Sequence, residues 1–159
     1  MSSSLQTTRQ ICGIDTEVVI QNYADRILVL VTQLGKVGNL IQATIPPAEP
    51  LLPPPASSEP GKPSLPAPPA SIQLTPLLGN APSDHLQTLH SLYASQVATI
   101  VWTAETDGLM QADRRPIIVG IALRKSSDVT TVEGLSEQER AVFFGVMKTV
   151  QELLAQRSK

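Results

Sequence analysis

The stretch Ile27-Leu28-Val29-Leu30-Val31 decides the fold of this chain. A run of five apolar residues has the length of a strand, and its β-branched side chains favour a strand over a helix. A strand with one face in water alternates apolar and polar residues, whereas this run is apolar on both faces. It is therefore predicted to be a central strand that is covered above and below.

Segments on both sides of this run show the alternation of further strands. A first segment, Gln10 to Gly13, leads into a turn around Gly13–Asp15, after which Val18 and Ile20 share one face. After the central run, 41, 43 and 45 share one face. Glycines at 35 and 38 predict a tight turn, since glycine readily adopts positive φ. Short connections of this kind predict an antiparallel meander.

Two more strands and two helices are predicted in the second half of the chain. Residues 71–75 alternate, and so do 117–123, where Gly120 and Ala122 leave room on one face for a close neighbour. Apolar residues at helical spacing follow a capping box that begins at Asp84 and another that begins at Ser136. The order is βββββ-α-β-α, an α+β fold with an about six-stranded, mainly antiparallel sheet and two helices.

Eleven of the fourteen prolines fall between Pro46 and Pro69. Proline removes amide donors and fixes φ, so this segment can join neither a helix interior nor a central strand. It also holds too little apolar bulk to fold alone. We predict a single domain over residues 1–159, interrupted by a disordered proline-rich insert at 46–69.

Composition narrows the classes of function. A net charge of −2 gives no electrostatic reason to expect nucleic acid or an anionic membrane as partner. The polar first ten residues lack the apolar stretch of a secretory signal, and no apolar run reaches the ~20 residues of a membrane span. One cysteine allows no intrachain disulfide. A cytoplasmic location, extending to the nucleus, is expected.

The central strand is apolar on both faces, so both faces of the sheet must be shielded from water. Two helices of this length can cover one face of a six-stranded sheet, but hardly both. The simplest solution is a second chain whose sheet packs on the remaining face, because a large exposed apolar patch is unusual on a soluble monomer. The alternative is a self-sufficient monomer with one helix on each face.

The segment Leu28-Val29-Leu30-Val31-Thr32-Gln33-Leu34-Gly35-Lys36-Val37-Gly38-Asn39-Leu40 resembles the signature hairpin of the proteasome assembly chaperone 3 family. There an apolar strand runs into Thr-Gln, an apolar residue, Gly-Lys, another apolar residue and Gly. The segment from Cys12 to Val19 also fits that family's pattern. The proline-rich insert departs from it.

The resemblance implies a dimer, formed with a chaperone 4-like partner or with a second copy, that assists early assembly of the alpha ring of the 20S proteasome by contacting its alpha subunits. The candidates for partner binding are the polar Thr32, Gln33 and Lys36, together with Leu28 and Leu30.

No motif in the sequence indicates an enzyme, a cofactor or a metal. The run Gly35-Lys36-Val37-Gly38 is too short for a phosphate-binding loop and is followed by a predicted strand. His85 and His90 lie five residues apart, on different faces of one helix. Cys12 is placed in a strand with no histidine nearby in the sequence to activate it.

An alternative function uses the insert itself. Its P-x-x-P spacings, such as Pro60 to Pro63 and Pro63 to Pro66, are typical of segments that dock in SH3 or WW domains. In that hypothesis the chain is an adaptor that displays a proline-rich loop on a small domain.

Overall fold

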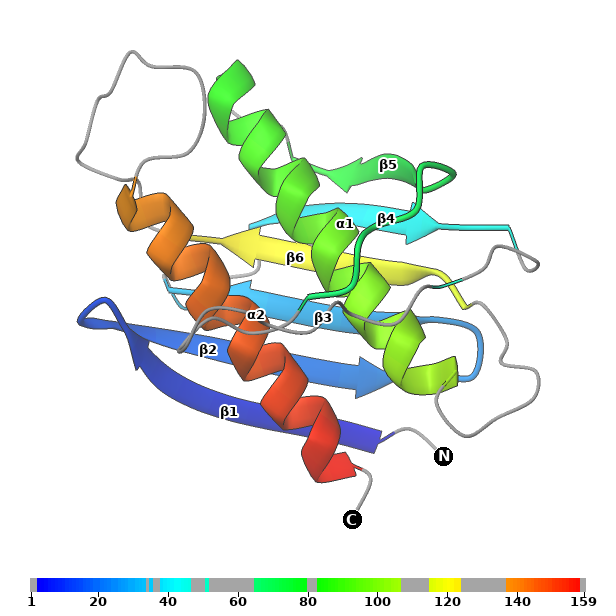
Figure 1. The fold of residues 1–159 in the computed structure, drawn as a ribbon, viewed down its shortest axis with the longest axis horizontal. Coiled ribbons are helices and arrows are strands. Elements are labelled where there is room, and N and C mark those ends of the chain that lie inside the picture. Colours follow the sequence, from blue (N-terminus) through cyan, green and yellow to red (C-terminus); the bar gives the residue numbers. More distant parts are fainter. Residues whose placement is uncertain are drawn as a thin grey trace.

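A computed structural model describes residues 3–33, 35, 38–46, 51, 65–79, 83–106, 115–123 and 137–157. These residues form a sheet and two helices in the predicted order βββββ-α-β-α (Figure 1). The elements are β1 (Ser3–Ile11), β2 (Ile14–Asn22), β3 (Ile27–Thr32), β4 (Asn39–Thr44), β5 (Gln73–Leu78), α1 (Asp84–Thr106), β6 (Ile117–Ala122) and α2 (Glu137–Arg157). The α+β class is confirmed.

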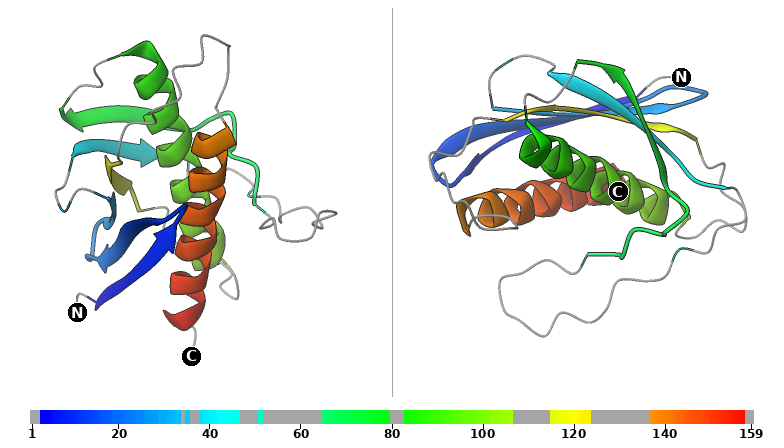
Figure 2. Two further views of the ribbon diagram at one scale, coloured as in Figure 1. Left: turned by 90° about the vertical axis from the view of Figure 1, so that its left-hand side faces the viewer. Right: turned by 90° about the horizontal axis from the view of Figure 1, so that it is seen from above.

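Both helices lie on the same face of the sheet, so the described fold has two layers (Figure 2). Burial alternates accordingly along β2 and β3: in β3, Ile27, Val29 and Val31 are buried, while Leu28 and Leu30 are half-buried. The central β6 is buried along its whole length. The alternative with one helix on each face is therefore wrong. No helix in the described ranges is long and apolar enough to cross a membrane.

The strand order is β1-β2-β3-β6-β4-β5. The predicted meander through β3 and β4 is wrong at this point, because β6 lies between them and pairs parallel with β3 and antiparallel with β4. All other neighbouring pairs are antiparallel. Sequence spacing favoured a hairpin, but the connection through residues 33–38 instead joins two strands that have β6 between them in the sheet.

Gly38 lies where this connection enters β4, against the end of β6. Its φ is 71°, as is that of Gly35, so both glycines adopt the positive φ that the sequence predicted. A side chain on Gly38 would meet the backbone of Ile121 and the Cβ of Ala122. The close approach of β4 to β6 therefore depends on this glycine.

The core lies between the helices and the sheet. Its largest fully buried side chains are Trp102, Tyr93, Ile20, Ile27, Ile117, Ile121, Met147 and Leu153.

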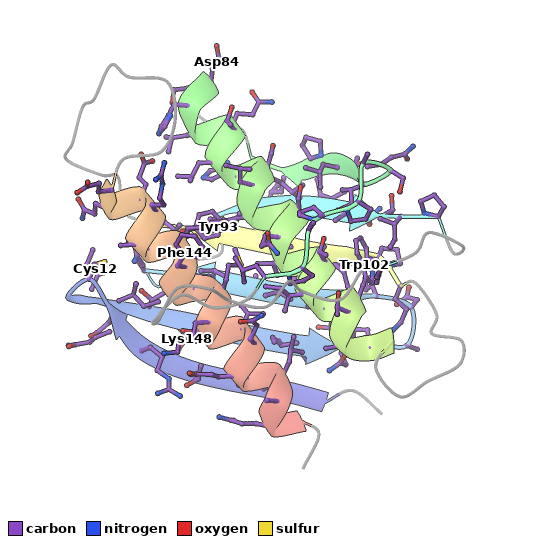
Figure 3. The ribbon with its side chains drawn as sticks, viewed as in Figure 1. Cys12, Asp84, Tyr93, Trp102, Phe144 and Lys148 are labelled. Carbon is purple, nitrogen blue, oxygen red and sulfur yellow. The ribbon has the colours of Figure 1, made fainter. Side chains whose placement is uncertain are left out.

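Arg115 joins three elements at one end of this core. Trp102 on α1 donates its indole Nε1–H to the Arg115 carbonyl at 2.9 Å (Figure 3). The Arg115 guanidinium donates to the carbonyl of Tyr23 at 2.6 Å and pairs with Glu105 at 3.1 Å. The end of α1, the entry to β6 and the turn before β3 are thus held together.

The start of α1 differs by one residue from the expected cap. Ser83, rather than Asp84, is the N-cap, because its Oγ accepts from the amide of Leu86 at 3.2 Å. Asp84 instead occupies the first helical position, where its charge is favourable to the helix dipole. The helix start itself is confirmed.

Part of the proline-rich segment packs on the domain. Leu51 and Leu65 are partly buried against the core, and Pro66 is buried. Gln96 on α1 donates its side-chain amide to the Pro66 carbonyl at 2.8 Å. Residues 47–50 and 52–64 lie outside the described residues, so their disorder stays a prediction. Pro66 is not displayed for recognition, which weakens the adaptor hypothesis.

Candidate functional site

The sheet has a second face, opposite the helices, which we call the open face. No helix in the described part of the chain packs on it (Figure 2). Four neighbouring strands give this face an apolar centre, because the outward residues of β3 and β6 are mainly apolar or glycine and β2 and β4 each add one apolar residue beside them. These residues are Val19, Leu28, Leu30, Leu40, Ile118, Gly120 and Ala122.

Strand register aligns the apolar residues in a row across the sheet. Leu30 is paired with Val19 on one side and with Gly120 on the other. Leu40 flanks Gly120 from β4. Gly120 is buried between the two half-buried leucines, so Leu30 and Leu40 form the accessible apolar part of the row. These two side chains can pack against an apolar surface of another protein.

Polar residues border the apolar centre along β1 and part of β4 and β5, whereas the exposed Leu77 and Leu78 border it at the end of β5. Gln6 and Thr8 on β1, Gln42 on β4 and Thr75 on β5 share the open face by register. Gln6 donates its side-chain amide to a carboxylate oxygen of Glu17 at 2.7 Å across β1 and β2. An apolar core with a polar rim is the usual anatomy of a protein–protein interface.

The structure separates the predicted partner-binding residues. Leu28, Leu30 and Thr32 lie together on the open face and are half-buried. Gln33 points to the helix side, where its side-chain amide donates to Thr16 Oγ1 at 3.0 Å. Lys36 lies outside the described residues. The five candidates therefore do not form one site in the described structure.

Three residues of the open face were missed in the sequence analysis. On its face of β2, Val19 stands between the polar Glu17 and Gln21, and Leu40 precedes the alternation of 41, 43 and 45. Ile118 shares the face of Gly120 and Ala122, but its pairing with Leu28 and Gln42 follows only from the position of β6. The order of the strands in the sheet, which local sequence patterns do not determine, was needed to find these residues.

A small cavity of about 60 Å³ lies on the helix side, near the starts of α1 and α2. It is lined by Ile14, Gln33, Leu86, Leu89, His90, Tyr93, Leu123, Gln138, Glu139 and Val142. Burial, with the nearby Glu139 carboxylate, raises the pKa of Tyr93 well above its ordinary value. His85 Nε2 lies 2.8 Å from a carboxylate oxygen of the same Glu139 and joins the two helices. A cavity of this size has room for a few waters.

His90, at this cavity, should make folding stability sensitive to pH. Desolvation by burial lowers the pKa of its imidazole below the ordinary 6.5. Asn39 lies with its Nδ2 3.2 Å from His90 Nδ1, so the neutral ring can accept that amide proton whereas the charged ring cannot. The unfolded chain therefore binds the proton more readily, and stability present above about pH 6.5 is lost as the pH falls.

We expect the free energy of unfolding, measured by urea titration, to fall between pH 7 and pH 5. A His90→Gln variant should show a shallower fall, and His85→Gln provides the control for the other histidine. If the free energy of unfolding falls equally steeply with pH in the wild type and in His90→Gln, His90 is not the group responsible for the pH dependence.

The described residues provide no cluster of three His, Cys, Asp or Glu side chains that could hold a metal ion. Cys12 is exposed in the turn between β1 and β2, with a φ of 53° (Figure 3). Its predicted place inside a strand is wrong, because β1 ends one residue earlier. The open face is therefore the strongest candidate site.

The fold and this face define a class: a two-layer α+β protein in which no described helix covers one face of the sheet. No family model matches the chain. Its sequence is 49% identical over 39 residues to proteasome assembly chaperone 3 from Bos taurus, covering 24% of this chain and 32% of that protein. The human protein is 47% identical over 38 residues, covering 24% and 31%.

These matches confirm the resemblance to the proteasome assembly chaperone 3 family. The matched part of the chain spans about a third of the length of these curated relatives. Among solved structures, a chain of the "Crystal Structure of a Novel Chaperone Complex for Yeast 20S Proteasome Assembly" has a TM-score of 0.48 and 9% identity, over 96% of this chain and 98% of that chain.

Proposed function

We propose that this chain is a non-enzymatic chaperone of proteasome assembly that works through its open face. The observation that carries the proposal is the apolar row from Val19 to Leu40, on a sheet face that no helix covers in the described part of the chain. The similarity to proteasome assembly chaperone 3 supports the choice of target.

The physical argument concerns the half-buried leucines. Fully burying a Leu or Val side chain is worth about 1.5–3 kcal/mol relative to leaving it in water. Leu28, Leu30, Leu40 and Val19 each realise only part of this gain in the isolated chain. A second sheet packed on the open face would complete their burial, with the hydroxyl and amide side chains of the rim supplying hydrogen bonds.

The occupant of the open face in this proposal is a chaperone 4-like chain or a second copy of this chain. The resulting dimer holds unassembled alpha subunits during early alpha-ring formation, in the cytoplasm and the nucleus. A transient chaperone must release its target, and interfaces of ~1,200–2,000 Å² span a wide range of affinities. Their size does not prevent release.

Leu30→Asp tests the proposal. It places a charge at the centre of the open face, where pairing would bury the charge without a partner. We expect the wild-type chain to sediment as a dimer, alone or with the chaperone 4-like protein, and to recover unassembled alpha subunits from cells in which ring assembly is blocked. Leu30→Asp should lose both activities while its melting temperature stays within a few degrees.

Leu92→Asp is the matched control. Leu92 is 42% exposed on α1, on the other side of the molecule, so its replacement should leave both activities intact. A wild-type chain that stays monomeric at high micromolar concentration, both alone and mixed with the chaperone 4-like protein, would contradict the proposal. Recovery of mature 20S particles as readily as free alpha subunits would contradict it as well.

A further inference from the structure

The two edges of the sheet are built differently. β5, at one edge, has six residues, contains Pro76, and pairs with β4 through a register shift at Leu40/Ile41. Short length, proline and irregular pairing are the devices by which natural sheets prevent edge-to-edge association. This edge is closed to a further strand.

β1, at the other edge, lacks these devices. It has nine residues, contains no proline, and pairs with β2 in unbroken register from Ser3 to Ile11. Its one charged side chain, Arg9, is paired at 3.4 Å with Glu152 of α2 on the helix side. In the described part of the chain, β2 is the only strand that pairs with β1, so the other side of β1 forms an edge of the sheet (Figure 1). The amides and carbonyls on that side can pair with another strand.

We infer that β1 is a second interaction surface, and that it pairs antiparallel with β1 of a second copy about a two-fold axis at Thr7. Residue 7 is the midpoint of a strand that runs from 3 to 11, so this register alone uses all nine residues of both copies.

The side chains of β1 are complementary to themselves in this register. On the open-face side Gln6 lies opposite Thr8, so an amide faces a hydroxyl. On the helix side Leu5 lies opposite Arg9, whose aliphatic stem can cover it. A register centred on Arg9 would instead place two like charges directly opposite each other, which is unfavourable. Charge and length therefore select the same register.

Antiparallel pairing about this axis keeps the open faces of the two copies on the same side. The two six-stranded sheets then form one continuous sheet with a doubled open face. Two such pairs can stack through their open faces into a closed assembly of D2 symmetry. Edge pairing thus adds a second interface to the one in the proposed function and does not depend on it.

Cysteine cross-linking tests the register. In the full chain with Cys12→Ser, which removes the native thiol, Thr7→Cys would place two thiols opposite each other across the axis. Directly opposite residues have Cα atoms about 4.5–5.5 Å apart, within the range of a disulfide. Oxidised glutathione should convert most of the Thr7→Cys chain to a covalent dimer. Thr88→Cys, at an exposed threonine on α1 and away from both β1 and the open face, should form little covalent dimer.

A second variant tests the same edge without covalent chemistry. Thr7→Lys sets two like charges opposite each other, so in the Leu30→Asp background, where the open face is blocked, the dissociation constant from sedimentation should rise about fivefold. Thr88→Lys should leave the dissociation constant unchanged. Equal cross-linking at positions 7 and 88, or association that Thr7→Lys does not weaken, would overturn the inference. A wild-type β1 whose amides gain exchange protection only with an unrelated protein would overturn it too.

Discussion

Trp102→Ala is expected to destabilise the fold by about 3–5 kcal/mol, the usual cost of removing a large buried aromatic side chain. Trp102 is 1% exposed and is among the largest fully buried side chains of the core. Its removal would leave a cavity between α1 and the sheet. It would also leave the carbonyl of Arg115 without the indole donor at 2.9 Å.

Trp102→Phe separates these two contributions. The phenyl ring fills much of the cavity but has no N–H, so the loss should be nearer the cost of one unsatisfied buried acceptor, about 1–3 kcal/mol. Because Trp102 is the only tryptophan, unfolding must be followed in urea by circular dichroism rather than by fluorescence. Equal stability of the Ala variant and the wild type would show that Trp102 does not pack as described.

Gly38→Ala is expected to cost about 2–5 kcal/mol, the sum of a non-glycine residue at positive φ and of overpacking. The added Cβ would meet the backbone of Ile121, which cannot rotate away as a side chain can. β4 would have to separate from β6, and the apolar row on the open face would be interrupted between Gly120 and Leu40.

Gly35→Ala is the matched control for this prediction. Gly35 has the same φ of 71°, but a Cβ there would have no atom within 4 Å. Its replacement should therefore cost only the backbone term, about 1–2 kcal/mol. The measurement is the midpoint of urea unfolding for both variants. If the two variants lose equal stability, the contact between Gly38 and β6 contributes nothing.

Local patterns in the sequence predicted the elements well, and long-range pairing poorly. The apolar run at Ile27–Val31 identified the central strand, and apolar periodicity located both helices. β1 was not recognised as a full strand because its side chains are mostly hydroxyl and amide groups, with Leu5 and Ile11 its only large apolar residues. The position of β6 between β3 and β4 cannot be read from any local pattern. The same residues would be buried if β3 and β4 were neighbours and β6 lay elsewhere in the sheet.

The candidate site was predicted in the same partial way. Leu28 and Leu30 were predicted as interface residues because a strand that is apolar on both faces must be packed against other residues on each face. Gln33 was assigned to the partner surface from its place in a family-like motif, but it continues the alternation of β3 onto the helix side. Motif position alone could not decide the direction of that side chain.

The place of β6 has a consequence for the order in which the chain is made. Until Ile117–Ala122 leave the ribosome, β3 has no neighbour on that side, and β4 and β5 cannot join the strands synthesised before them. The nascent chain thus carries an apolar half-sheet of β1, β2 and β3 until β6 has been made. Such unfinished edges are prone to wrong pairing. The chain therefore needs protection from other exposed strands during the synthesis of residues 33–122.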